Sequence, residues 1–172
     1  EYNIGEDLDS LMNIDPRGYG VCRILYPAAR EYAGGPLSTN FAKKLLETVK
    51  EGDLVYIISG FVLPPFGVPE TDGIISTVLL CRTLVLLGIK PVVVCPEGNL
   101  PAVKAMAPVV GLHLYNSPEE IMNLPAAMAV VPFTKDVNEA AKQAKTLLDK
   151  KPAAVITNEA PGANKNGIYH NA

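Results

Sequence analysis

Three acidic residues stand just beyond the expected ends of two buried strands. Glu70 and Asp72 lie one residue apart, after the apolar, β-branched run 54–58 and a proline-rich loop. Glu159 stands just beyond a later apolar run, 153–157. Because parallel strands present their carboxyl ends at one edge of a sheet, we expect these carboxylates to converge at the edge where open α/β sheets bind ligands.

The donor type predicts a hard divalent cation at this edge. No cysteine stands near these positions and the chain has only two histidines, so Mg²⁺, Mn²⁺ or Ca²⁺ is favoured over zinc. Two or three carboxylates held close together repel one another, and a bound cation relieves that repulsion.

The same residues have a plainer interpretation. Asp72 would be only the N-cap of a helix that begins at Gly73 and runs through 74–87, and Glu70 would be a solvated loop residue. The start of such a helix also offers free backbone N–H groups and a positive dipole end, which suit a carboxylate or phosphate ligand. From the residues alone, both interpretations stay open.

Apolar runs typical of buried strands alternate with segments of helical periodicity after residue 53. We expect strands at 54–58, 91–95, 112–115, 129–131 and 153–157, with helices at 74–87, 99–109, from 118, and 136–149. This alternation predicts an α/β fold: a mostly parallel sheet covered by helices on both faces, three-layered and Rossmann-like.

The first fifty residues show no strand pattern. They predict helices over 7–13, from Val21 past Pro27 to Tyr32, and over 40–49 with Ser38 as N-cap. We expect these helices to cover the sheet within a single domain that spans residues 1–172. The loop 61–69 contains three prolines and a glycine, which predicts irregular structure there.

The composition limits the class of protein. With 172 residues, of which 48% are apolar and 19% charged, the chain can bury a globular core. A net charge of −3 with scattered basic residues argues against nucleic acid as a partner. No apolar run is long enough to span a membrane. Three widely separated cysteines, Cys22, Cys81 and Cys95, predict reduced thiols in a cytoplasmic protein.

No glycine-rich dinucleotide loop or Walker sequence is present, so no nucleotide cofactor is expected.

The chain resembles the D-glutamate cyclase-like domain family, found alone in bacteria and archaea and at the end of a mitochondrial enzyme. The resemblance rests on Gly60, the proline-rich loop, the segment Glu70-Thr71-Asp72-Gly73 with its helix, and the segments 159–162 and 166–171. It implies a lyase that converts D-glutamate to 5-oxo-D-proline and water with a divalent cation, Mn²⁺ or Mg²⁺. It further implies metal ligands at Glu70, Asp72 and Glu159, catalytic roles for Asp72 and Glu159, and substrate contacts at Thr71, Gly73, Tyr169 and Asn171.

The chain departs from the family pattern at three places. Ile74 stands where members have a proline, and Ala160 stands where they have an arginine that would anchor a substrate carboxylate. The family's domain also continues past residue 172 into a glycine-rich acidic segment. We therefore expect residues 1–172 to lack the C-terminal part of that domain.

Two other functions would use the same features. A divalent-metal-dependent phosphatase would hold a small phosphate ester on the cation and the helix N-terminus. A non-catalytic binding or assembly subunit would use its apolar surplus, seen in a positive mean hydropathy, as the interface of a homo-oligomer. For either enzyme the expected partner is a small anionic substrate, an amino acid or a phosphate ester.

Overall fold

The computed structural model describes residues 2–63 and 67–168. The chain forms two compact units, residues 1–48 and residues 49–172, and each unit is described by itself. The single domain, with its N-terminal helices covering the sheet, therefore stays a prediction.

The first unit is built from three helices: α1 (Tyr2–Met12), α2 (Val21–Ala33) and α3 (Leu37–Thr48). α2 runs through Pro27 and ends at Gly34, whose left-handed backbone (φ 72°) lets its N–H bond to carbonyl oxygens of the last turn. α3 begins at Leu37, so the prediction of Ser38 as its N-cap was wrong.

Asp9 of α1 supplies the cap that α3 lacks. Its carboxylate is 2% exposed and accepts hydrogen bonds from the backbone N–H groups of Leu37 (2.6 Å) and Ser38 (2.9 Å) and from the Tyr26 hydroxyl (3.0 Å). The Ser38 hydroxyl, at 2.5 Å, is a fourth donor. Burial raises the pKa of Asp9, but the hydrogen bonds from Ser38, Leu37 and Tyr26 outweigh burial and lower it to about 2. A residue of another helix thus satisfies the free N–H groups that begin α3.

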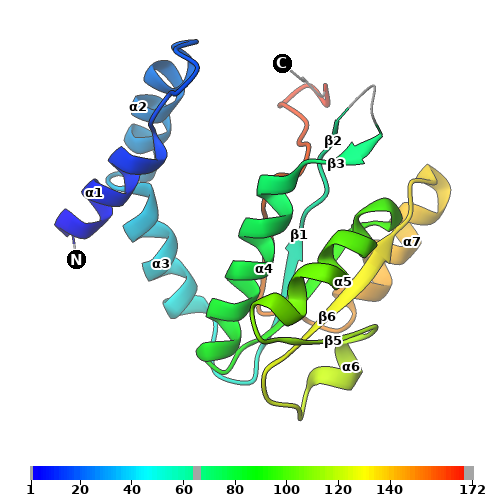
Figure 1. Ribbon diagram of the computed structural model, residues 1–172. Coiled ribbons are helices and arrows are strands. Elements are labelled where there is room, and N and C mark those ends of the chain that lie inside the picture. Colours follow the sequence, from blue (N-terminus) through cyan, green and yellow to red (C-terminus); the bar gives the residue numbers. More distant parts are fainter. Residues whose placement is uncertain (1, 64–66, 169–172) are drawn as a thin grey trace. The chain divides into compact units, whose positions relative to one another are not determined.

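The second unit contains a five-stranded parallel sheet of order β5-β6-β4-β1-β7 (Figure 1). Every neighbouring pair of strands in it is parallel. The strands are β1 (Leu54–Ile58), β4 (Lys90–Pro96), β5 (His113–Tyr115), β6 (Ala127–Phe133) and β7 (Ala154–Thr157). All five predicted strands are confirmed, although β4 and β6 are longer at both ends than the predicted 91–95 and 129–131.

Helices cover both faces of this sheet. Side chains alternate along a strand, so Tyr56, Val92 and Ala129 share one face, where α6 (Pro118–Ile121) and α7 (Val137–Leu148) pack through Ile121 and Leu147. The opposite face lies under α4 (Thr71–Leu86) and α5 (Leu100–Val109) (Figure 1). The residues that fill this second layer are almost fully buried: Val55, Ile57, Val93, Val78, Cys81, Leu84, Val103 and Ala107. The predicted three-layer α/β fold is confirmed.

The loop after β1 contains regular structure that the sequence did not predict. β2 (Val62–Leu63) and β3 (Val68–Pro69) form a short antiparallel pair, with Val62 opposite Pro69. Proline lacks the N–H group but keeps its carbonyl, so Pro69 can stand at the end of a two-residue strand. The expectation of irregular structure throughout 61–69 was therefore wrong.

The cysteines of the chain are free. Cys81 and Cys95 lie in the core of the second unit, where burial raises the pKa of both thiols. In the described part of the chain, no helix combines the length and the apolarity that a membrane span requires.

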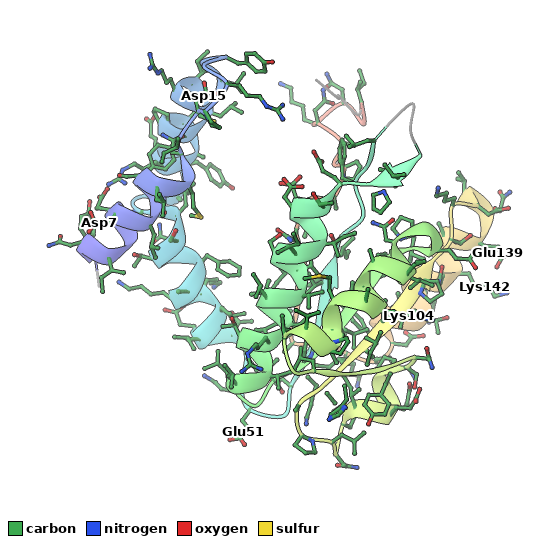
Figure 2. All side chains as sticks on the ribbon, in the orientation of Figure 1. Asp7, Asp15, Glu51, Lys104, Glu139 and Lys142 are labelled. Carbon is green, nitrogen blue, oxygen red and sulfur yellow. The ribbon has the colours of Figure 1, made fainter. Side chains whose placement is uncertain are left out.

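Replacing Asp9 tests the cap of α3. We expect Asp9→Asn to lower the free energy of unfolding of the first unit by about 1.5–3 kcal/mol, because hydrogen bonds to a charged acceptor are lost or weakened. Hydrogen–deuterium exchange should become faster in residues 2–48 and stay unchanged in 49–63 and 67–168. Asp7→Asn is the matched control, since Asp7 lies on the same helix with an exposed side chain (Figure 2).

The depressed pKa fixes the direction of the pH dependence. In the folded chain the pKa of Asp9 falls from its ordinary 3.8 to about 2, so its stabilisation is complete above the ordinary value and is lost as the pH falls through about 2. As the pH falls from 3.8 to about 2, the amides of residues 2–48 in the wild-type protein should lose protection against hydrogen exchange. The Asp9→Asn protein has no carboxylate that titrates at this position, so it should not show the loss of protection that Asp9 causes. Equal acid sensitivity of the two proteins would contradict the assigned role.

Candidate active site

The carboxyl ends of β7, β1 and β4 lie next to one another in the sheet. β1 pairs in parallel with both β4 and β7, so the chain leaves the sheet at one edge after Ile58, Pro96 and Thr157. Glu159 follows β7, and Glu70 ends the loop that follows β1. This is the edge at which open α/β sheets bind ligands.

The backbone of Phe61 anchors two acidic residues that are far apart in sequence. The Phe61 N–H donates to the Glu159 carbonyl oxygen at 3.0 Å. The Phe61 carbonyl oxygen accepts from the Glu70 N–H, also at 3.0 Å. Both residues are thus fastened to one point of the loop after β1.

The side chain of Asn158 fastens the end of β7 to the first turns of α4. Its amide donates to the Gly73 carbonyl oxygen (3.2 Å), to Ser76 Oγ (2.9 Å) and to Thr77 Oγ1 (2.8 Å). Because Asn158 directly precedes Glu159, this amide determines where Glu159 meets α4. Asn158 was not among the predicted site residues, and its only sequence signal is a polar residue directly after an apolar run.

Glu159 packs directly on Gly73. A Cβ atom added to Gly73 would lie 2.6 Å from Glu159 Cβ and 3.2 Å from its Cγ, so the position accepts only glycine without rearrangement. Glu159 itself has a left-handed backbone, with φ of 46°, which is uncommon outside glycine and costs free energy. Gly73, predicted as a substrate contact, therefore has a packing role whether or not a ligand touches it.

Burial and the two other carboxylates raise the pKa of Glu159. Burial raises it most, and the negative charges of Asp72 and Glu70 raise it further. The structure thus brings together the three acidic residues that the sequence singled out. Their roles as metal ligands and catalytic groups stay predictions.

The plainer interpretation placed Asp72 at the N-cap of α4, and the structure places it elsewhere. The N-cap position is Glu70 (φ −70°, ψ 136°), and the helix begins at Thr71. Asp72 lies in the first turn, with an exposed side chain whose Oδ1 accepts from the Gly73 N–H at 3.0 Å. Asp72 is therefore not the N-cap. Of the predicted substrate contacts, Thr71 is exposed at this helix start, whereas Tyr169 and Asn171 lie outside the described residues.

Two buried polar side chains at this edge have an atom without a hydrogen-bond partner: Ser59 Oγ and Asn99 Oδ1. Ser59 follows β1 and is 5% exposed, and Asn99 ends the short helix η1 (Glu97–Asn99) after β4 and is 1% exposed. Ser59 Oγ would lie 3.7 Å from a Cβ atom on Gly73, which places it beside the start of α4. Buried polar atoms usually have partners, so these two are candidates for ligand contact that the sequence did not reveal.

The side chains at this edge are of the type that binds a divalent cation, but the described residues are not arranged as a metal site. Carboxylate oxygens are the ligands that Mg²⁺, Mn²⁺ and Ca²⁺ prefer. Within residues 2–63 and 67–168, however, no three His, Cys, Asp or Glu side chains are arranged closely enough to hold an ion. We assign no reaction step to a metal, and the predicted cation stays a prediction.

Comparison with known proteins connects this edge to one family. The family described as D-glutamate cyclase-like, C-terminal, matches residues 8–172, a range that includes all three carboxylates. Neither the comparison with curated proteins nor the comparison with solved structures gave a match.

Replacing Gly73 tests the contact that positions Glu159. We expect Gly73→Ala to lower the free energy of unfolding by about 1–3 kcal/mol, the usual cost of overpacking, less up to about 1 kcal/mol gained from the helix propensity of alanine. Urea denaturation measures the difference. Gly98→Ala is the control, because a Cβ atom there meets no other atom within 4 Å. A Gly73→Ala protein as stable as the wild type would show that Glu159 is not held against the helix.

Proposed function

The chain belongs to the D-glutamate cyclase-like family, and from this premise we propose that it is a lyase that converts D-glutamate to 5-oxo-D-proline and water. The observation that carries the proposal is that Glu70 and Glu159 are both hydrogen-bonded to the backbone of Phe61 at the carboxyl edge of the sheet, beside the start of α4 that carries Asp72.

The reaction requires a folded substrate and the movement of protons. The amine nitrogen of D-glutamate attacks the carboxyl carbon of its own side chain, so that one C–N bond forms, one C–O bond breaks and the oxygen leaves as water. No atom is oxidised or reduced. The ammonium must lose two protons, before and during the attack, and the carboxylate oxygen that leaves as water must gain two. A protein catalyses this step by holding the folded conformer and by providing an acid–base group.

Glu159 is the residue best suited to move these protons. Burial, and then the charges of Asp72 and Glu70, raise its pKa, so its carboxylate is a stronger base than that of a free glutamate. The substrate ammonium would lie between Glu159 and Asp72, with Glu70 adding to the attraction. A carboxyl group of the substrate would meet the Thr71 hydroxyl and the N–H groups at the start of α4, beside Gly73. Tyr169 and Asn171 stay in the proposal as substrate contacts.

A divalent cation, Mn²⁺ or Mg²⁺, belongs to the proposal as a counter-charge. Bound to carboxylates of Glu70, Asp72 and Glu159, it would offset their mutual repulsion. The phosphatase, the assembly subunit and the homo-oligomer stay predictions, and no contact among the described residues favours them over the lyase.

The activity test follows 5-oxo-D-proline by proton NMR, with D-glutamate and with Mn²⁺, Mg²⁺ or no added cation. We expect wild-type protein to form the product. Asp72→Asn should form it more slowly by a factor of about 100 or more, which is the usual size of an acid–base contribution. Glu139→Gln is the control. It removes an exposed carboxylate of α7 that is not among the candidate site residues, so it should retain the wild-type rate (Figure 2).

Two results would contradict the proposal. One is an Asp72→Asn protein that cyclises D-glutamate at the wild-type rate. The other is a wild-type protein that leaves D-glutamate unchanged with every cation but releases phosphate from small esters, which would favour the phosphatase.

A further inference from the structure

One buried hydroxyl group at the carboxylate edge has no hydrogen-bond partner within the described part of the chain. Ser59 directly follows β1 and is 5% exposed, and its Oγ atom neither donates nor accepts there. Buried polar groups in proteins almost always have a partner, because leaving water without one costs free energy. The Ser59 hydroxyl is therefore suited to a partner that a ligand supplies.

The backbone of Ser59 is held between two neighbouring strands. The Ser59 N–H donates to the Val94 carbonyl oxygen at 3.1 Å, and the Ile58 carbonyl oxygen accepts from the Asn158 N–H at 2.9 Å. These bonds continue the pairing of β1 with β4 and β7. Because side chains alternate along a strand, Ser59 shares the face of Ile57, which lies under α4. The sheet therefore sets the position of the hydroxyl beside this helix.

The Ser59 hydroxyl and Glu159 meet at Gly73 of α4. A Cβ atom added to Gly73 would lie 3.7 Å from Ser59 Oγ and 2.6 Å from Glu159 Cβ. Both side chains thus lie within 3.7 Å of one point on the first turn of α4, the turn that carries Asp72. The side chain of Glu159 is exposed, so a ligand that meets its carboxylate from solvent arrives beside Ser59.

Packing does not account for a hydroxyl group at this position. Alanine fills nearly the same space as serine without a polar atom. The residues that precede Ser59 on the same face of β1, Val55 and Ile57, are apolar and completely buried. A hydroxyl beside them bears the cost of desolvation without a hydrogen bond in return. Contact with a ligand accounts for it.

The charges around Ser59 decide which group of a ligand suits it. Glu159 packs on the same glycine as Ser59, and Asp72 directly precedes that glycine. Glu70 and Glu159 are bonded to the backbone of Phe61. A ligand carboxylate in contact with Glu159 would be repelled, whereas an ammonium group would be attracted. An ammonium group also brings three N–H donors, which carboxylate and hydroxyl oxygens accept.

We propose that the Ser59 hydroxyl oxygen accepts a hydrogen bond from the ammonium group of an amino-acid substrate while that group faces Glu159. The assignment rests on the proposed function, because it takes D-glutamate as the ligand. Ser59 is then a substrate-binding residue that holds the nitrogen from the side of the sheet. Once Glu159 has taken a proton, the hydroxyl still accepts an N–H of the neutral amine. It thereby keeps the nitrogen in place for attack on the side-chain carboxyl group.

A stability measurement separates this role from a structural one. We expect Ser59→Ala to unfold at the same urea concentration as the wild type or at a higher one, because the change removes a buried polar atom that has no partner. A lower midpoint would show that the hydroxyl supports the fold and would overturn the inference.

Binding is measured by titrating ¹⁵N-labelled protein with D-glutamate and following amide chemical shifts. We expect the amides of 59–60 and 72–73 to shift. Ser59→Ala should raise the dissociation constant about tenfold or more, the usual effect of losing a hydrogen bond to a charged group. Thr83→Ala is the matched control, because Thr83 is an exposed residue of α4 whose hydroxyl donates to the Leu79 carbonyl oxygen at 3.1 Å. Its dissociation constant should equal that of the wild type.

A second ligand tests which group of the substrate meets Ser59. Glutarate has both carboxyl groups of D-glutamate but no amine. We expect it to bind the wild type more weakly than D-glutamate or not at all, and to lose no further affinity with Ser59→Ala. An equal loss of affinity for the two ligands would place a carboxyl group at Ser59 and would overturn the inference.

The outcomes separate this inference from the proposed function. If D-glutamate is cyclised and Ser59→Ala binds it as well as the wild type, the inference is wrong and the lyase stands. If D-glutamate is not cyclised but binds with the expected dependence on Ser59, the contact stands and the lyase fails. Absence of shifts at 59–60 and 72–73 with D-glutamate overturns the inference.

Discussion

The contact between Glu159 and Gly73 is the constraint on which the candidate site depends. Glu159 adopts a left-handed backbone conformation. Its side chain packs against Gly73 of α4, where a Cβ atom would not fit. The Asn158 amide holds the end of β7 to the helix, and the backbone of Phe61 holds Glu159 and Glu70 to one point of the loop. Local strain at Glu159 is therefore balanced by several tertiary contacts. The result is a group of carboxylates whose charges act on one another, which the local sequence around any one of them does not determine.

Three negative charges at one edge favour a positively charged partner. Burial raises the pKa of Glu159 most and the charges of Asp72 and Glu70 raise it further, and a bound cation relieves that repulsion. A substrate ammonium and a divalent ion both satisfy that condition. The negative charge of this edge thus agrees with the ammonium group of the substrate that we propose.

Features with a local signal were predictable from the sequence. The continuous β-branched run 54–58 is β1, and the order of strands and helices gave the parallel three-layer sheet. The shared edge of Glu70 and Glu159 followed because parallel strands end together. Features that depend on contacts between distant residues were not predictable. Asp9 caps a helix in place of Ser38, and Asn99 becomes a buried, partly unpaired group only after β4 meets β1. The cavity lined by Glu97, Lys135 and Gln143 was not predictable either, because it depends on the face of the sheet to which each connection leaves.

The most direct measurement is the pKa of the Glu159 carboxyl group, followed by ¹³C NMR in the wild type and in Asp72→Asn. The account predicts a raised pKa in the wild type. It predicts a lower value in Asp72→Asn that still exceeds that of a free glutamate, because burial and Glu70 remain. Glu139→Gln, which removes a carboxylate from α7, should leave the wild-type value unchanged. An ordinary pKa in the wild type, or the same raised pKa with and without the Asp72 charge, would show that the carboxylates do not act together and would contradict the account.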